Sequence, residues 1–257
     1  MKKKANIQEM QLYKLSEEII DLAQNHDPFF NYLTRAIVLP NLKKKKARLI
    51  DLGCGGGRNL IAAAKKGYQV IGIDINRKAL HIASKRLSEE GLASKNNLYS
   101  ADITKMNGRK WGNFDYCILQ EVIEHINNYQ KAIDVAYREL KKGGVMILTT
   151  PNNPAQWNIL DDYAGHLRRF TNLEIREALT RFTAVKVFTV GFPFHRLSIY
   201  FYNIYLNSIK GDHDAAVFRA NSLFGKLYFY LGTILLYFDH LWNFIPRGTT
   251  IVAVAVK

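Results

Sequence analysis

Two spacings of apolar residues alternate along this chain, and together they predict strands separated by helices. Short, mostly apolar runs have the length of buried strands. They cover residues 48–52, 68–74, 97–100, 114–120, the last part of 140–151, 184–190 and 249–256. Apolar residues recur at helical spacing over residues 7–22, 29–39, 59–66, 77–90, 129–140 and 171–181. This alternation predicts an α/β fold with a parallel sheet and helices on both faces, in which ligands bind beyond the carboxyl ends of the strands.

Several of these elements carry end signals. Asn76 is a typical helix cap and Gly91 a typical helix stop. Pro40 is expected to stop the helix over residues 29–39. Residues 140–151 (LKKGGVMILTTP) are expected to hold a helix end, a two-glycine turn and then a strand.

The run over residues 47–59 (ARLIDLGCGGGRN) passes through the acid Asp51 and opens into four glycines. Glycine lets the backbone turn sharply and approach a ligand, where a side chain would block the approach or forbid the dihedral angles. The first amides of the helix over residues 59–66 would face this turn and hold a carboxylate. Asp74 ends the second strand about twenty residues later, as a ribose-binding acid requires. The turn is predicted to seat a cofactor, although simple tight connections also use such glycines.

Three further motifs follow in order, namely ADI after the third strand, FDYCILQEVIEHI from the fourth and LKKGGVMILTTPN at the fifth. Together with DLGCGGG and GIDIN, they resemble the motifs of the class I S-adenosylmethionine-dependent methyltransferases. The resemblance covers residues 47–191 and is closest to the branch that methylates ubiquinone precursors and many small molecules. It implies a Rossmann-like, seven-stranded, mostly parallel sheet with an antiparallel final strand.

The resemblance also implies a cofactor and the residues that bind it. The methyl donor would be S-adenosylmethionine, which leaves as S-adenosylhomocysteine. The implied contacts are Asp51, Gly53, Gly55 and Gln120 at the methionine part, Asp74 and Ile75 at the ribose, and Asp102 and Ile103 at the adenine.

A hydroxyl acceptor needs a general base or a metal at the point of transfer, because its pKa is high. Glu121, Glu124 and His125 would share one face of a helix that starts after the fourth strand. His166, in the segment GHLRRF, would come back over the same mouth. A metal-free base role for His125 or His166 is the favoured interpretation. A divalent metal held by these four residues, as some relatives use, and a purely structural role are the alternatives.

Composition narrows the class of protein. The chain has 257 residues, of which 48% are hydrophobic, enough for one sizeable α/β domain with an elaboration. A net charge of +14 fits solvated lysine runs, or attraction to nucleic acid, anionic lipid or an acidic substrate. Arg168 and Arg169 are candidates for binding an anionic substrate group. Only two cysteines, Cys54 and Cys117, favour a reducing compartment, and no signal-peptide hydrophobic region follows the first lysines.

We expect a single domain with leading helices over residues 1–46, a cofactor-binding core over 47–191 and a final strand within 248–257. Residues 192–247 form an aromatic, apolar insertion where a short hairpin would suffice. Its longest uncharged run, 227–238, has twelve residues, short of the ~20 of a membrane-spanning helix. The insertion is expected to be a helical cap over the active site, with a peripheral membrane contact or a homodimer interface as alternatives.

These features predict a cytoplasmic methyltransferase, peripheral to the membrane if the insertion binds lipid. It would act at oxygen on a small-molecule, lipid-linked or saccharide acceptor. RNA ribose methylation with a divalent metal is the leading alternative, because of the positive charge and the EVIEH acids. A non-catalytic membrane or protein adaptor that keeps the fold is another. A dinucleotide oxidoreductase is disfavoured by Asp51 and by the spacing of Gly53, Gly55 and Gly57.

Overall fold

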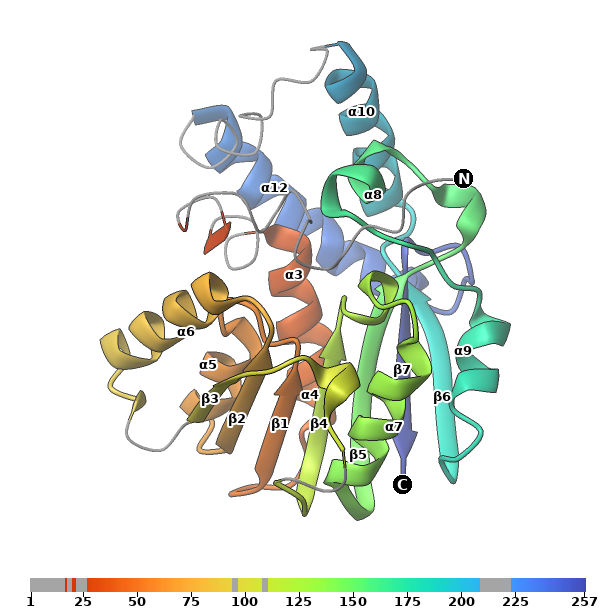
Figure 1. Cartoon of the computed structure of the whole chain (residues 1–257). Coiled ribbons are helices and arrows are strands. Elements are labelled where there is room, and N and C mark those ends of the chain that lie inside the picture. The colour runs from red at the N-terminus through yellow and green to blue at the C-terminus, as the bar shows by residue number, and fades with distance from the viewer. Residues whose placement is uncertain (1–16, 18–19, 22–26, 94–96, 108–110, 209–222) are drawn as a thin grey trace.

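The computed structural model describes residues 17, 20–21, 27–93, 97–107, 111–208 and 223–257. Within these residues, one seven-stranded sheet has the order β3-β2-β1-β4-β5-β7-β6 (Figure 1). Its strands are β1 (Arg48–Leu52), β2 (Gln69–Asp74), β3 (Asn97–Ser100), β4 (Phe114–Gln120), β5 (Leu140–Pro151), β6 (Ala184–Val190) and β7 (Thr250–Val256). Strand β7 runs antiparallel to β5 and β6, and the other pairs are parallel. The predicted mostly parallel sheet is confirmed.

Helices cover the sheet and its carboxyl edge (Figure 1). Those that follow the strands are α5 (Arg58–Lys65), α6 (Arg77–Glu89), α7 (Tyr129–Glu139) and α9 (Asn172–Ala178). The others are α3 (Pro28–Tyr32), η2 (Leu33–Val38), α4 (Leu39–Asn41), α8 (Ile159–Ala164), α10 (Phe194–Ser208) and α12 (Leu223–Asp239). Short 3-10 turns are η4 (Ile103–Lys105), η5 (Ile123–His125), η6 (Pro154–Gln156) and η7 (His240–Trp242). The helix expected over residues 7–22 lies outside the described residues, apart from residues 17 and 20–21.

The core has two layers because successive strand residues point to opposite faces of the sheet. In β4, Tyr116 and Ile118 pack in one cluster with residues of α5, whereas Cys117 and Leu119 pack in another with residues of α7. Both faces are therefore covered, as the sequence predicts for a parallel sheet. Cys54 and Cys117 are both free and buried.

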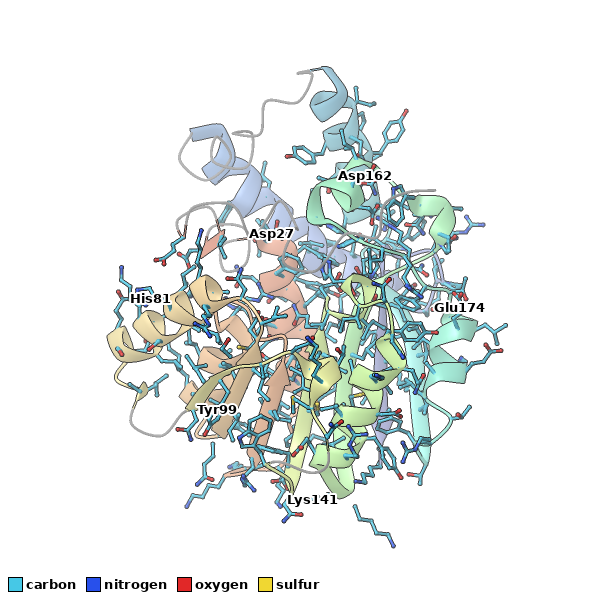
Figure 2. All side chains as sticks on the ribbon, viewed as in Figure 1. Asp27, His81, Tyr99, Lys141, Asp162 and Glu174 are labelled. Carbon is cyan, nitrogen blue, oxygen red and sulfur yellow. The ribbon has the colours of Figure 1, made fainter. Side chains whose placement is uncertain are left out.

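The two edges of the sheet differ in character. The parallel strands end toward α3, α8, α10 and α12, and Asp27 and Asp162 lie on that side (Figure 2). Lys141 lies at the opposite edge, where it and Lys44 both pair with Asp115. The lysine run over residues 43–46 is exposed there, away from the loops that carry the candidate site residues.

Pro40 does not stop the second helix, so that prediction is wrong. The helical path runs without a break from α3 through η2 to Asn41. Proline has no N–H to donate. The π register of η2, in which the Leu39 N–H donates to the Thr34 carbonyl, widens the helix by one residue just before it.

The two-glycine turn expected before the fifth strand is also wrong. Helix α7 ends at Glu139, and Leu140 already pairs with Phe114 in β5. Gly143 has φ +74° and lies within β5, where the register against β4 shifts. A Cβ on Gly144 would lie 3.0 Å from the Phe114 carbonyl oxygen. The glycines therefore form an irregularity inside the strand instead of a separate turn.

The described part of the insertion packs against helix α3. Helix α12 packs on α3 and on α10. Asp239, which is fully buried, accepts hydrogen bonds from the backbone N–H groups of Phe194 (2.7 Å) and His195 (2.8 Å). The end of α12 thus fixes the start of α10. Among the helices that the structure describes, none combines the length and apolar character needed to cross a membrane.

Candidate active site

The glycine turn after β1 is held tightly against two neighbouring segments. The Gly53 and Cys54 N–H groups both donate to the Ile73 carbonyl, at 2.7 and 3.0 Å. Gly53 has φ +81°, and a Cβ there would lie 2.5 Å from the Val122 side chain. Only glycine can occupy that position without displacing the segment after β4. The turn and the residues after β4 therefore form one unit.

Asp74 ends β2 directly beside this turn. Its carboxylate accepts hydrogen bonds from the Gly55 N–H (2.8 Å) and the Asn76 N–H (2.7 Å). Burial raises the pKa of Asp74, and these backbone N–H groups oppose the rise. Asp74 thus braces the glycine turn from the position predicted for a ribose-binding acid. Its contact with a ribose stays a prediction.

Asp51 and Gln120 lie near the carboxyl ends of adjacent strands and are buried with unsatisfied polar atoms. Neither Asp51 oxygen nor the Gln120 Nε2 has a hydrogen-bond partner at bonding distance. Burial raises the pKa of Asp51 to about 7, while the Arg58 guanidinium and, at longer range, the Asn59 amide oppose the rise. Buried polar atoms without partners are costly, and a ligand is one way to satisfy them.

Asp102 and Ile103 follow β3 at the same edge. The Asp102 carboxylate caps η4 and accepts hydrogen bonds from the Thr104 N–H (2.9 Å) and hydroxyl (2.7 Å). Although burial raises its pKa, the bonds from Thr104 and the nearby Lys105 ammonium leave that pKa below its usual range. Ile103 is buried. Their predicted contact with adenine stays a prediction.

The expected helix carrying Glu121, Glu124 and His125 is not formed, so the prediction of a shared helix face is wrong. The Glu121 N–H still donates to the Thr149 carbonyl (3.0 Å), and Glu121 then turns with φ +53°. Only the 3-10 turn η5 follows. The Glu121 carboxylate accepts a hydrogen bond from the Thr149 hydroxyl (2.8 Å) and is not among the ligand atoms that gather around Glu124.

Glu124, His125 and His166 do come together. Each offers one ligand atom, and these atoms lie within 4.8 Å of one another. The Leu167 N–H donates to the Glu124 carbonyl (2.9 Å) and ties the two loops together. Burial and the neighbouring Glu121 carboxyl raise the pKa of Glu124 well above its usual range. Burial and His166 lower the pKa of His125 to about 3, so His125 is neutral near pH 7.

Asp161 completes the group, and sequence reasoning missed it. It is buried in α8 and accepts hydrogen bonds from His166 Nδ1 (2.7 Å) and Arg169 Nε (2.8 Å). It also accepts one from the Asn158 N–H (2.8 Å), as half of the capping box that starts α8. Because a carboxylate only accepts, the neutral His166 ring carries its proton on Nδ1 and its lone pair on Nε2. The spacing of Asn158 and Asp161 was the available sequence signal.

The two arginines named as anion-binding candidates have partners within the protein. Arg169 donates to Asp161 and to the Asn152 carbonyl (3.1 Å). Arg168 donates to the Asn127 carbonyl (3.2 Å), and its guanidinium lies 5.3 Å from the centre of the Tyr129 ring. Both therefore hold the loop that carries His166.

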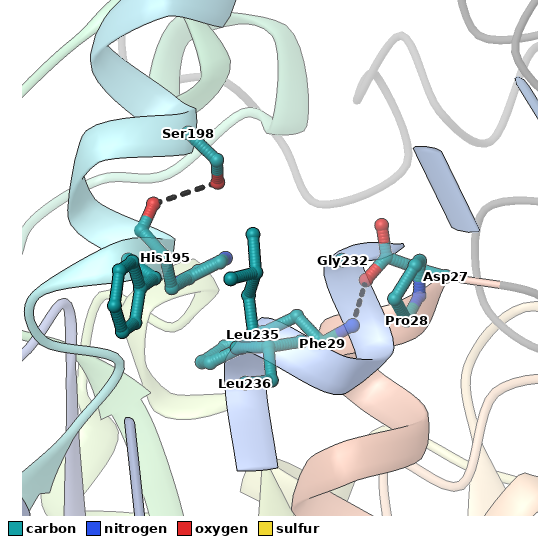
Figure 3. A pocket seen from close by; sticks show the side chains of 9 residues that line it. Asp27, Pro28, Phe29, His195, Ser198, Gly232, Leu235 and Leu236 are labelled. Atoms are coloured by element: carbon teal, nitrogen blue, oxygen red, sulfur yellow. Dashed lines mark hydrogen bonds between the residues drawn. The ribbon is translucent and has the colours of Figure 1, made fainter. Parts of the chain in front are cut away.

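A cavity of about 40 Å³ lies between α3, α10 and α12 (Figure 3). His195 lines it, stacks on Phe29 at 3.8 Å between ring centres, and shares a hydrogen bond with the Thr249 hydroxyl (2.7 Å). Burial lowers the pKa of His195 to about 3. Ligand pockets usually have ~300 Å³ or more. This cavity is therefore too small to receive an acceptor molecule.

Comparison with curated proteins finds ubiquinone biosynthesis O-methyltransferases. That of Psychrobacter arcticus is 30% identical over 111 residues, 43% of this chain and 43% of that protein. That of Dechloromonas aromatica is 33% identical over 111 residues, 43% of this chain and 47% of that protein. The mitochondrial enzyme of Rattus norvegicus is 28% identical over 139 residues, 54% of this chain and 37% of that protein. The chain thus spans less than half the length of these curated relatives.

Solved structures share the fold at lower sequence identity. Phosphoethanolamine N-methyltransferase 2 of Haemonchus contortus, in complex with S-adenosyl-L-methionine, has a TM-score of 0.63 and 20% identity. The aligned region covers 94% of this chain and 56% of the Haemonchus chain. The [4+2]-cyclase SpnF has a TM-score of 0.64 and 17% identity, and the aligned region covers 98% of this chain and 97% of that chain. Because a cyclase shares this fold, the fold alone does not identify a reaction.

The family described as "Methyltransferase domain" matches residues 25–183. The match takes in the glycine turn, every strand end that carries a candidate site residue, and the loop that carries His166. This chain belongs to the methyltransferase domain family.

Proposed function

We propose that this chain transfers a methyl group from S-adenosylmethionine to an oxygen atom of a small-molecule or lipid-linked acceptor. The observation that carries the proposal is the pair of unsatisfied buried groups, Asp51 and Gln120, beside the glycine turn. Family membership supports methyl transfer, and the names of the curated relatives, which are O-methyltransferases, support an oxygen acceptor. Nothing in these comparisons favours RNA or an adaptor role.

The residues present fit this cofactor. The Asp51 carboxylate is an acceptor suited to the ammonium of the methionine part, and the Gln120 amide nitrogen is a donor suited to its carboxylate. Asp74 is assigned to the ribose, with Ile75 beside it, and Asp102 and Ile103 to the adenine. The Gly53 and Gly55 N–H groups are engaged within the turn, so these glycines contribute close approach of the backbone. When bound, S-adenosylmethionine supplies an electrophilic methyl group.

His166 is the proposed general base. Its Nε2 lone pair would take the acceptor's hydroxyl proton while the acceptor oxygen bonds to the methyl carbon and the bond from that carbon to sulfur breaks, which leaves S-adenosylhomocysteine. Asp161 holds the ring by Nδ1 and stabilises the resulting imidazolium. His125 is a weaker base, because its pKa is lowered to about 3. The enzyme's other contribution is to position the two reactants and exclude water.

A divalent cation at Glu124, His125 and His166 is the second candidate for activating the hydroxyl. The close approach of three ligand atoms favours it. Against it, burial raises the pKa of Glu124 well above its usual range, which favours a proton on the carboxyl over a cation. Turnover that is unchanged by a chelator and by added Mg²⁺, Mn²⁺ or Zn²⁺ is expected for the base. Turnover that is lost to the chelator and restored by one ion would select the metal instead.

The insertion is proposed to hold the protein, within the cytoplasm, against an anionic membrane surface. Helices α10 and α12 and the segment after them expose many large apolar side chains, namely Leu197, Tyr200, Phe201, Ile204, Tyr230, Leu231, Ile234, Leu235, Tyr237, Phe238, Leu241 and Phe244. Arg196 and Arg247 are exposed beside them, and the whole chain carries a net charge of +14. Exposed apolar side chains with cations beside them suit a lipid surface with negative head groups. Such a surface would deliver a lipid-linked acceptor.

Calorimetry and a transfer assay test the proposal together. We expect S-adenosylhomocysteine to bind and NAD not to bind. Labelled methyl groups from S-adenosylmethionine should appear on phenols or lipid-linked phenols in a panel that also contains saccharides and RNA. Binding of NAD in place of S-adenosylhomocysteine would refute the cofactor, and label on RNA alone would refute the acceptor class.

A further inference from the structure

Three buried side chains, Thr34, Asn59 and Gln120, and the partly buried Arg58 form one hydrogen-bonded chain, here called the relay. It runs from η2 to the proposed cofactor seat, which is the glycine turn with Asp51 and Gln120. Arg58 Nε donates to the Thr34 hydroxyl (3.0 Å), which donates to Asn59 Oδ1 (2.6 Å). Asn59 Nδ2 donates to Gln120 Oε1 (3.0 Å). Thr34, Asn59 and Gln120 are each less than 9% exposed. Water therefore has little access to these side chains, so an amide that rotated out of its hydrogen bonds would stay unsatisfied.

The bonds of this chain all run in one direction. A guanidinium only donates, so the Thr34 oxygen accepts from Arg58, and the Thr34 hydrogen is directed to Asn59 Oδ1. Asn59 must then present its oxygen to Thr34 and its NH₂ group to Gln120. Consequently Gln120 accepts with Oε1 and leaves its NH₂ group, which has no partner at bonding distance, for a ligand. The Asn59 side chain also lowers the pKa of Asp51, as a donor facing that acid would.

The π segment η2 brings Thr34 to this chain. The Thr34 carbonyl accepts from the Leu39 N–H five residues later, which is a π-helical bond. The helix contacts α5, whose first two residues are Arg58 and Asn59. Such widened turns are frequent at functional sites. Here the widened turn joins an element before β1 to a residue at the end of β4.

We propose that Thr34 and Asn59 are positioning residues that orient the Gln120 amide, so that the seat presents donors to the carboxylate of an α-amino acid group and the Asp51 acceptor to its ammonium. This inference rests on the proposed function and deepens it. According to it, the positions of the hydrogen-bond donors and acceptors at the methionine end of the seat are fixed by Thr34 of η2. Neither residue needs to touch the ligand.

The test compares two adenosine compounds that differ at this end. S-adenosylhomocysteine carries the α-amino acid group, and 5′-deoxy-5′-methylthioadenosine lacks it. In Thr34→Val the hydrogen-bonded chain from Arg58 to Gln120 is broken. The side-chain amides of Asn59 and Gln120 can then rotate, so that Gln120 presents its oxygen to the carboxylate of the ligand. We expect about tenfold weaker binding of S-adenosylhomocysteine by calorimetry, with binding of methylthioadenosine unchanged. Thr34→Ser keeps the hydroxyl and should restore the affinity.

The control is Thr189→Val. Thr189 is also buried, and its hydroxyl donates to the Ile245 carbonyl (3.0 Å) away from the relay. It should leave both affinities unchanged. If Thr34→Val does not fold, Asn59→Asp is used, because an acid there accepts from both Thr34 and Gln120 and turns the Gln120 oxygen to the ligand. That variant should also lose S-adenosylhomocysteine selectively.

Two results separate failure of this inference from failure of the proposed function. In the first result, the wild-type chain binds S-adenosylhomocysteine, but Thr34→Val or Asn59→Asp weakens the binding of both compounds equally or changes the binding of neither. The relay is then overturned, and the proposed cofactor stands. If the wild-type chain binds neither compound, the proposed cofactor is overturned, and the relay with it.

Discussion

The cofactor seat and the insertion beside it present opposite kinds of surface. In the seat, bare backbone and buried polar groups such as Asp51 and Gln120 meet at the ends of paired strands. On the insertion, large apolar side chains of α10 and α12 face outward, and Phe201 and Tyr230 are 60% and 68% exposed. The seat is built to satisfy charge and polarity at fixed positions. The insertion offers area without fixed polar partners, which suits a lipid surface better than a defined small molecule.

The largest effect is expected at His166, in the loop after α8, which is the helix that contacts α10 of the insertion. His166→Ala should lower kcat by roughly 10²–10⁴-fold, because it removes the base that takes the acceptor's proton. Binding of S-adenosylhomocysteine should not change, since His166 is assigned to the acceptor side. Rates measured with saturating donor, together with calorimetry, check both statements.

Two variants sharpen that result. His125→Ala should reduce kcat less, because a histidine whose pKa is about 3 is a poor base near pH 7. Asp161→Asn keeps the size of the side chain but allows the other His166 tautomer, so it should lower kcat and leave binding of S-adenosylhomocysteine unchanged. Equal losses in His125→Ala and His166→Ala, both reversed by one divalent ion, would replace the base with a metal site.

The next effect is expected at Asp74. Asp74→Asn should weaken S-adenosylhomocysteine by roughly 10–100-fold, because two ribose hydroxyls lose a charged acceptor. The same change should cost much less with the 2′-deoxy compound, and that difference isolates the ribose contact. Equal losses for both compounds would show that Asp74 acts only through its bonds to the turn at Gly55 and Asn76.

A smaller effect follows from the protonation of Asp51. Burial raises its pKa to about 7, so the anion that suits an ammonium is lost as the pH falls through that value. Binding of S-adenosylhomocysteine should weaken by up to about tenfold per pH unit below 7, and Asp51→Asn should bind weakly at every pH. Calorimetry between pH 5.5 and 8, in buffers that allow proton uptake to be counted, measures this.

The same group has the opposite effect on the stability of the ligand-free protein. A carboxyl whose folded pKa is raised contributes stability below its unfolded pKa of ~3.9, and that contribution is lost as the pH rises through about 7. Asp51→Asn should therefore raise the Tm at pH 8 while it weakens the ligand. A lower Tm in the variant at pH 8 would contradict the assignment of a buried, unsatisfied acid.

Sequence reasoning located most of the fold because the deciding signals are local. The strand over residues 114–120 and the strand over 184–190 match β4 and β6 at both ends, since short apolar runs and their flanking turns lie next to each other in the chain. The errors came from long-range pairing. Gly143 and Gly144 signal a turn locally, but Leu140 and Val145 on either side of them pair with β4, and both glycines form backbone hydrogen bonds with Lys257.

The candidate site divides in the same way. Asp51, Asp74 and Asp102 stand next to strand ends, so their places follow from the sheet. Thr34 and Asp161 were missed, because each reaches the site from a helix that only tertiary packing brings near. Glu121 was placed on a helix by its spacing, yet its bond to the Thr149 carbonyl and its positive φ keep it out of a helix with Glu124 and His125.

The smallest effect is expected on the insertion, where single side chains contribute little to a large contact. Tyr200→Ser with Phe201→Ser removes two side chains of α10 that are 61% and 60% exposed. We expect a severalfold smaller fraction of protein to sediment with phosphatidylglycerol vesicles, with binding of S-adenosylhomocysteine unchanged. Leu173→Ser, at a 64% exposed position on α9, is the matched control and should sediment like the wild-type chain. If the wild-type protein does not sediment with vesicles but forms dimers, and the double variant does not form them, the face is a homodimer interface instead.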